Sequence, residues 1–132
     1  MMSTAPDYEE RAKNYGFAPQ LDVLAALGRS DTVVLDVRRE DEIAETGKIP
    51  ATNWKQTACT PDACPHLAAD PTQFGGPNKD APIVIYCRSG RRAVAAQNLL
   101  EKSGYKHVMN AGGYDDVMQL LKWQQRENCA SK

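Results

Sequence analysis

The chain has 132 residues and a net charge of −1, from 16 basic and 17 acidic side chains. This balance excludes a whole-molecule attraction to nucleic acid or to an anionic membrane, so any electrostatic function must be local. The length fits one domain, and no apolar run approaches the roughly 20 residues that a transmembrane helix needs.

The two ends of the chain are polar. We expect residues 1–16 to be an N-terminal tail, residues 17–124 to be one folded domain and residues 125–132 to be a polar C-terminal tail. The N-terminal residues include acidic side chains and lack the apolar core of a secretory signal. The expected location is therefore cytoplasmic, with an organelle as the alternative if a targeting segment has been removed.

Patterns typical of helices and strands alternate between the two ends. The runs at 32–37 and 83–86 are apolar, as in strands buried on both faces of a parallel sheet. Apolar residues recur at helical spacing in 92–103 and 114–123. In chain order, we predict a helix at 20–27, a strand at 32–37, a helix at 41–46, a strand at 49–54, a proline-rich and mostly irregular stretch at 55–82 with a short helix at 66–69, a strand at 83–86, a helix at 92–103, a strand at 107–109 and a helix at 114–123.

This alternation predicts an α/β domain with a mainly parallel central sheet that is flanked by helices on both faces. Ligands of such sheets bind beyond the carboxyl ends of the strands. Two places are thereby nominated for a functional site, one after Val37 and one after Tyr86.

Cys87 is the candidate nucleophile, because it lies between a predicted strand and a predicted helix. The N–H groups of such a loop form an anion nest, and the helix adds the positive end of its dipole. Arg88, Arg91 and Arg92 bring three cations close in sequence, and Gly90 permits a backbone that other residues resist. All of these features favour the nucleophilic thiolate. The alternative is a buried structural thiol, but apolar packing does not explain three arginines.

Three motifs resemble those of the rhodanese family, in the same order along the chain. Residues 87–92, Cys-Arg-Ser-Gly-Arg-Arg, resemble its active-site pattern C-x-x-G-x-R. Residues 35–53 resemble its first signature, and Asn-Ala-Gly-Gly-Tyr at 110–114 resembles its G-G-[YF]-x-x-W signature. Lys48 and Val117 stand where the family usually has histidine and tryptophan.

The resemblance implies a rhodanese-like fold and a thiosulfate sulfurtransferase that uses no cofactor. Cys87 would take sulfur from a small anionic donor as a persulfide, and a thiol such as glutathione or thioredoxin, or cyanide, would then accept it. Arg88 and Arg91 would attract the donor, whereas Arg92 would order the loop. We expect a monomer or a weak dimer. The expected substrate-binding residues are Arg88, Ser89, Gly90, Arg91 and Arg92.

Other functions remain open. A cysteine phosphatase or arsenate reductase on this fold would need arginine at position 93, where the chain has Ala93, and phosphatases carry histidine in the place of Tyr86. A rhodanese-like binding or regulatory module is a second alternative, although inactive members often lack the cysteine. A carrier that passes sulfur from protein to protein would use the same Cys87 chemistry.

Asp36 and Arg38 follow the first predicted buried strand and could support the site. The simpler interpretation is a structural ion pair of Arg38 with Glu42, which would tie the strand to the next helix.

The remaining cysteines are expected to be reduced, because their density is far below that of a disulfide scaffold. A zinc site made of Cys59, Cys64, His66 and Cys129 is disfavoured by its irregular spacing, so no metal is expected. Another hypothesis is that Cys59 or Cys64 resolves the Cys87 persulfide as an internal disulfide.

Overall fold

A four-stranded parallel sheet organises the chain in the computed structural model, which describes residues 6–130, with side-chain burial for residues 7–125. The strand order is β2-β1-β3-β4, so the two long buried runs form the centre of the sheet. Because all four strands are parallel, their carboxyl ends meet at one edge. The strands are β1 (Val33–Asp36), β2 (Trp54–Gln56), β3 (Ile83–Cys87) and β4 (Val108–Gly113).

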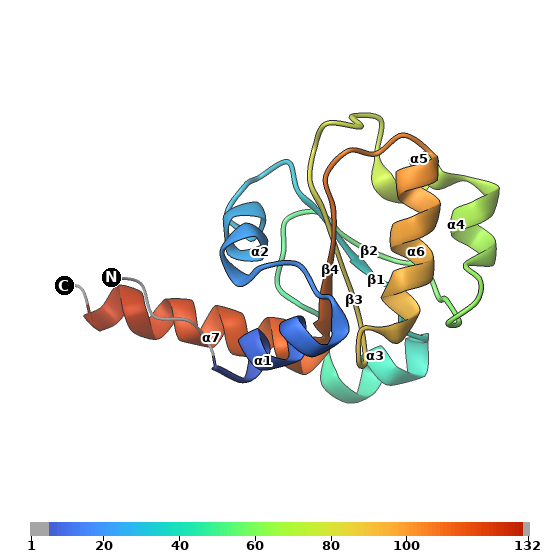
Figure 1. Ribbon diagram of the computed structural model, residues 1–132. Coiled ribbons are helices and arrows are strands. Elements are labelled where there is room, and N and C mark those ends of the chain that lie inside the picture. Colours follow the sequence, from blue (N-terminus) through green and yellow to red (C-terminus); the bar gives the residue numbers. More distant parts are fainter. Residues whose placement is uncertain (1–5, 131–132) are drawn as a thin grey trace.

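Helices cover both faces of this sheet, which confirms the predicted α/β class (Figure 1). Helices α1, α2 and α7 lie on one face, and α4, α5 and α6 lie on the other (Figure 1). Helix α3 follows β1 at the carboxyl edge. No helix in residues 6–130 is long and apolar enough to cross a bilayer. The helices are α1 (Pro6–Tyr15), α2 (Gln20–Leu27), α3 (Glu40–Thr46), α4 (Pro65–Ala69), α5 (Pro71–Gly75), α6 (Arg91–Lys102) and α7 (Tyr114–Ala130).

The strands divide their side chains between two apolar layers, because successive residues point to opposite faces. Val84 and Tyr86 pack in the layer under α1, α2 and α7. Ile85 and Cys87 pack in the layer under α4 and α6. The last residue of β3 therefore places its sulfur on the α6 side of the sheet.

The prediction of an N-terminal tail is wrong for residues 6–15, which form α1. Tyr8 is fully buried in the core, and its hydroxyl donates a hydrogen bond to the Ala18 carbonyl at 2.7 Å. Arg11, Ala12 and Tyr15 follow Tyr8 at helical spacing and so lie on the same side of the helix. In such a polar segment this spacing is only a weak signal of a helix. At the other end, the backbone of α7 continues helical through residues 125–130, where a tail was expected.

The strand predicted at 49–54 is also misplaced. Ile49 is fully buried but precedes Pro50, which has no N–H group to donate to a neighbouring strand. Pairing begins at Trp54, which lies opposite Val34, and the Trp54 indole donates to the Tyr86 hydroxyl at 2.8 Å. The irregular stretch at 55–82 contains α5 as well as a short helix close to the one predicted at 66–69.

We predict that Tyr8→Ala lowers the free energy of unfolding by about 3 kcal/mol or more, because it empties a fully buried aromatic site. Tyr8→Phe removes only the hydrogen bond to Ala18 and should cost about 1 kcal/mol. Urea unfolding monitored by circular dichroism measures both. Lys13→Ala, on an exposed side chain of the same helix, is the matched control and should stay within about 0.5 kcal/mol of the parent. Equal effects of the two alanine variants would show that α1 is not packed on the core.

Candidate active site

The loop between β3 and α6 holds the thiol of Cys87 against a backbone donor. Cys87 is fully buried, and its Sγ accepts a hydrogen bond from the Gly90 N–H at 2.9 Å. Gly90 has a φ of 93°, a conformation that side chains disfavour. A Cβ at Gly90 would also lie 2.5 Å from the Phe17 ring. Only glycine therefore fits this turn, and α6 begins directly after it.

The same peptide unit is held from its outer side by α1. Arg11 donates through Nη2 to the Ser89 carbonyl at 3.4 Å. In a trans peptide the C=O of one residue and the N–H of the next point in opposite directions. Fixing the Ser89 carbonyl outward therefore fixes the Gly90 N–H inward, toward the sulfur. A cation on the carbonyl also polarises the peptide and strengthens that N–H as a donor.

The following peptide unit is held in the same way. Asn110, within the edge strand β4, donates through Nδ2 to the Gly90 carbonyl at 3.0 Å, and its Oδ1 accepts from the Gly112 N–H at 2.9 Å. Arg11 also donates through Nε to Asp116 at 2.8 Å. Asp116 in turn accepts the Gly113 N–H at 2.7 Å. The loop is thus tied to α1, β4 and α7.

Sequence reasoning missed Arg11, Asn110 and Asp116 as supports of this loop. Asn110 belongs to a motif that the family resemblance singled out, but its side-chain role was not foreseen. Asp116 sits at the start of α7 without any motif of its own. Arg11 lay in the expected tail, and only the helical spacing of its neighbours marked it.

The three loop arginines have different surroundings. Arg92 makes a two-pronged ion pair with Glu42 of α3, at 2.6 and 2.7 Å. The hydrogen bonds from Arg92 hold the pKa of Glu42 at about 2, well below its usual value. Arg88 and Arg91 are exposed, and neither side chain has an ion pair or a side-chain hydrogen bond within residues 7–125. Arg92 is therefore neutralised, whereas Arg88 and Arg91 keep their charge available at the loop.

Asp36 and Arg38 form a buried ion pair, with Arg38 Nη2 2.8 Å from Asp36 Oδ2. The expected pairing of Arg38 with Glu42 is wrong, because Asp36 takes Arg38 and Arg92 takes Glu42. Arg38 also donates to the Gly47 carbonyl at 2.9 Å, which ties the end of β1 to the end of α3. These contacts give the pair a structural role beside the loop.

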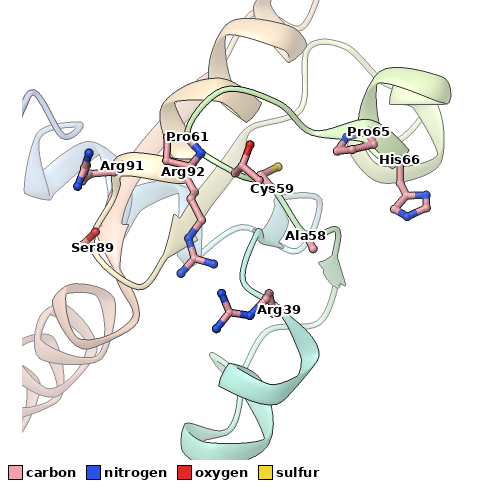
Figure 2. A pocket seen from close by; sticks show the side chains of 10 residues that line it. Arg39, Ala58, Cys59, Pro61, Pro65, His66, Ser89, Arg91 and Arg92 are labelled. Carbon is pink, nitrogen blue, oxygen red and sulfur yellow. The ribbon is translucent and has the colours of Figure 1, made fainter.

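A cavity of about 520 Å³ opens on the β2 side of the loop. Its rim carries Arg39 and Arg92, whose guanidinium groups face the same space (Figure 2). Ala58, Pro61 and Pro65 make part of its wall apolar. Cys87 itself is fully buried and is not among the residues that line this cavity. We call this cavity the arginine pocket; its lining residues are Arg39, Ala58, Cys59, Thr60, Pro61, Pro65, His66, Ser89, Arg91 and Arg92.

Cys59 and Cys64 are joined by a disulfide, so the prediction that they are reduced thiols is wrong. A turn brings the two cysteines together: the Thr60 N–H donates to the Ala63 carbonyl at 2.8 Å, and the Cα atoms of the two cysteines lie 4.3 Å apart. Among the described cysteines, Cys87 is the free one. The Cys129 side chain, named above as a candidate zinc ligand, lies outside the described side chains.

Comparisons with known proteins agree on one family. A family model described as "Rhodanese-like domain" matches residues 20–120. A rhodanese domain-containing protein of Drosophila melanogaster, CG4456, is 31% identical over 104 residues, which cover 74% of this chain and 86% of that protein. A protein named sulfurtransferase from Allochromatium vinosum is 36% identical over 86 residues, or 63% of this chain and 67% of that one. The structure of the human single-domain sulfurtransferase TSTD1 matches with a TM-score of 0.51 and 26% identity, covering 76% of this chain and 91% of that one.

We predict that Arg11→Met slows alkylation of Cys87 by iodoacetamide at pH 7 about two- to five-fold. The variant removes a partly exposed cation that orients and polarises the Ser89–Gly90 peptide, an effect on the order of 0.5–1 kcal/mol. Peptide mass spectrometry reports the rate at Cys87 alone. Arg29→Met is the matched control, because Arg29 pairs with Asp31 away from the loop. An unchanged rate in a folded Arg11→Met protein would show that this contact does not tune the thiol.

The Glu42–Arg92 pair predicts an acid-sensitive site. The pKa of Glu42 is lowered in the folded state, so its stabilising effect is full above the ordinary glutamate pKa and is lost as the pH falls toward about 2. Glu42→Gln should lower the free energy of unfolding by about 2 kcal/mol at pH 7, with the deficit shrinking steadily from pH 5 to pH 3. Urea unfolding at each pH measures this difference. Glu45→Gln, on the exposed side of α3, should show no such trend; a deficit of Glu42→Gln that is constant with pH would contradict the assignment.

Proposed function

Since the chain belongs to the rhodanese-like domain family, we propose that it is a sulfurtransferase that moves sulfane sulfur from thiosulfate, or a similar anionic donor, through a Cys87 persulfide to a thiol or cyanide. The names of its relatives support sulfur transfer in general. The observation that carries the proposal is the hydrogen bond from the Gly90 N–H to Cys87 Sγ at 2.9 Å. It places a fixed donor where an anionic sulfur would form.

Two displacement steps make up the proposed cycle. In the first, the Cys87 thiolate attacks the outer sulfur of thiosulfate, the sulfur–sulfur bond of the donor breaks, and sulfite leaves with the bonding electron pair. In the second, an acceptor thiolate attacks the outer sulfur of the persulfide and regenerates the Cys87 thiolate. The Gly90 N–H and the start of α6 stabilise negative charge on sulfur in both steps.

The unpaired charges at the loop suit a doubly negative donor. Arg88 and Arg91 are exposed and attract anions, whereas the positive charge of Arg92 is neutralised by its ion pair with Glu42. Arg92 therefore orders the loop, as its sequence position suggests, and Asp36 with Arg38 supports the neighbouring strand end.

Phosphate chemistry fits the loop less well. A phosphatase loop of this kind would need a guanidinium group at position 93 to hold a tetrahedral anion. Ala93, in the first turn of α6, is fully buried and offers no such group. Glutathione and thioredoxin are proposed as acceptors because both present a reactive thiol.

Incubation with thiosulfate tests the proposal. The intact chain should gain one sulfur atom, about 32 Da, and release one equivalent of sulfite, because Cys87 forms a covalent intermediate. Cys87→Ser should do neither. Cys129→Ser is the matched control, since it removes a different thiol, and should retain both signals. An adduct that persists in Cys87→Ser, or no adduct in the parent chain, would overturn the assignment.

A further inference from the structure

We propose that Cys59 and Cys64 form a second redox centre, whose reduced form takes sulfane sulfur from a small persulfide in the arginine pocket and releases it as sulfide. This inference rests on the proposed function, because the first transfer step supplies the persulfide. It gives the site a further activity, the reduction of a persulfide at the expense of a protein dithiol.

Cys59 lies in the same pocket as residues of the Cys87 loop. Cys59 lines the arginine pocket together with Ser89 and Arg91, two residues of the Cys87 loop (Figure 2). Cys59, Cys64 and Cys87 also share one buried apolar layer. Both cysteines are largely buried, with Cys59 5% and Cys64 2% exposed, so the disulfide meets the arginine pocket through Cys59 alone.

Backbone hydrogen bonds set the separation between the two sulfur centres. The Cys59 N–H donates to the Val37 carbonyl at 3.1 Å, and the Val37 N–H donates to the Tyr86 carbonyl at 3.0 Å. Cys59 thus continues the sheet two strand positions away from Cys87, or about 10 Å between backbones. A sulfur added to Cys87 extends its side chain by only about 2 Å. Direct transfer between the two cysteines would leave a gap, so sulfur must cross on a carrier.

The arginine pocket provides room for such a carrier. Its volume of about 520 Å³ lies in the range of pockets that enclose small organic ligands and far exceeds the needs of cyanide. Exposed Arg91, which has no ion pair within residues 7–125, favours an anionic molecule, whereas Arg39 at the same rim is paired with Asp41 at 3.0 Å. A small anionic thiol such as glutathione would collect sulfur at the Cys87 loop and hold the resulting persulfide beside Cys59.

The surroundings of the two cysteines assign their roles. Cys59 lines the arginine pocket, whereas Cys64 lines a separate cavity against α6, with Val94 and Leu99. Cys59 is therefore the attacking thiol. Cys64 is the resolving thiol, because the disulfide in the structure shows that its sulfur reaches that of Cys59.

The proposed reaction balances without a further oxidant. The Cys59 thiolate attacks the outer sulfur of the carrier persulfide, that sulfur–sulfur bond breaks, and the carrier thiolate leaves. The Cys64 thiolate then attacks Sγ of the Cys59 persulfide and expels hydrosulfide. The sulfane sulfur gains two electrons, and the two cysteines lose two as they form the disulfide. A dithiol reductant, of which reduced thioredoxin is an example, restores the pair by thiol–disulfide exchange.

A purely stabilising role explains the disulfide less well. The two cysteines are separated by only five positions, and short loops gain the least from a crosslink that constrains the unfolded chain. Hydrogen bonds of Thr60 Oγ1 with the Asp62 and Ala63 N–H groups already hold the turn, at 3.3 and 3.1 Å. The crosslink therefore adds little to the turn, and its place in the pocket wall is the feature that a redox role explains.

A single-turnover experiment on the whole chain tests the inference. Protein reduced with dithiothreitol and desalted without oxygen receives thiosulfate and one equivalent of glutathione. We expect about one equivalent of sulfide per chain and a Cys59–Cys64 disulfide in the peptide map. The same protein with this disulfide formed beforehand is the control and should release less than about a tenth as much sulfide. Equal sulfide from both forms, or no new disulfide, would overturn the inference.

Two matched variants separate the roles of the cysteines. After the same treatment, Cys64→Ser should retain one extra sulfur on Cys59, about 32 Da, because the resolving thiol is missing. Cys59→Ser should carry none on Cys64. A Cys64→Ser chain with no sulfur on Cys59 would contradict the order of attack. Sulfite release reports the Cys87 step: its loss would be a failure of the proposed function, whereas sulfite without sulfide would be a failure of this inference alone.

Discussion

The Cys87 thiol receives a backbone hydrogen bond from the Gly90 N–H only when the Ser89–Gly90 peptide has a single orientation. Because the peptide is planar and trans, its carbonyl then points away from the sulfur and needs a partner on the other side. Arg11 supplies that partner from α1. The geometry at a buried sulfur therefore depends on a cation in a helix that precedes the sheet by many residues.

Close backbone packing maintains this orientation. Gly90 leaves room for the Phe17 ring, and Gly113 allows the Arg88 carbonyl to approach where a Cβ would lie only 2.1 Å from that oxygen. Side chains at either position would push the loop off β4. The glycines around the loop are thus a packing requirement, and the hydrogen bonds from Asn110 and Arg11 act on a backbone that is already confined.

The sequence predicted the parts of the structure that local patterns determine. Buried β-branched runs predicted β1 and β3, and the position of Cys87 between a strand and a helix predicted its loop. Contacts between distant segments were not predictable in the same way. Glu42 lies four positions after Arg38, so the sequence favoured that pair, but the fold brings Glu42 to Arg92, 50 positions further along the chain.

Two other differences have similar causes. The N-terminal segment looked like a tail because its ten helical residues are mostly polar. The packing of the helix depends on contacts with distant residues, including those of buried Tyr8 and the Arg11–Asp116 pair. The disulfide was missed because a low cysteine count argues against crosslinks in general. A low cysteine count does not reveal the local turn at Thr60, which brings Cys59 and Cys64 close enough to bond.

The folded unit extends beyond the segment that the family model matches. The segment that matches the family model begins at residue 20, yet Tyr8, Arg11 and Phe17 contact the core and the Cys87 loop from outside that segment. The unit of homology is therefore smaller than the unit of folding. A substitution at Arg11, outside the segment that the family model matches, would therefore alter the contacts of the loop that holds Cys87.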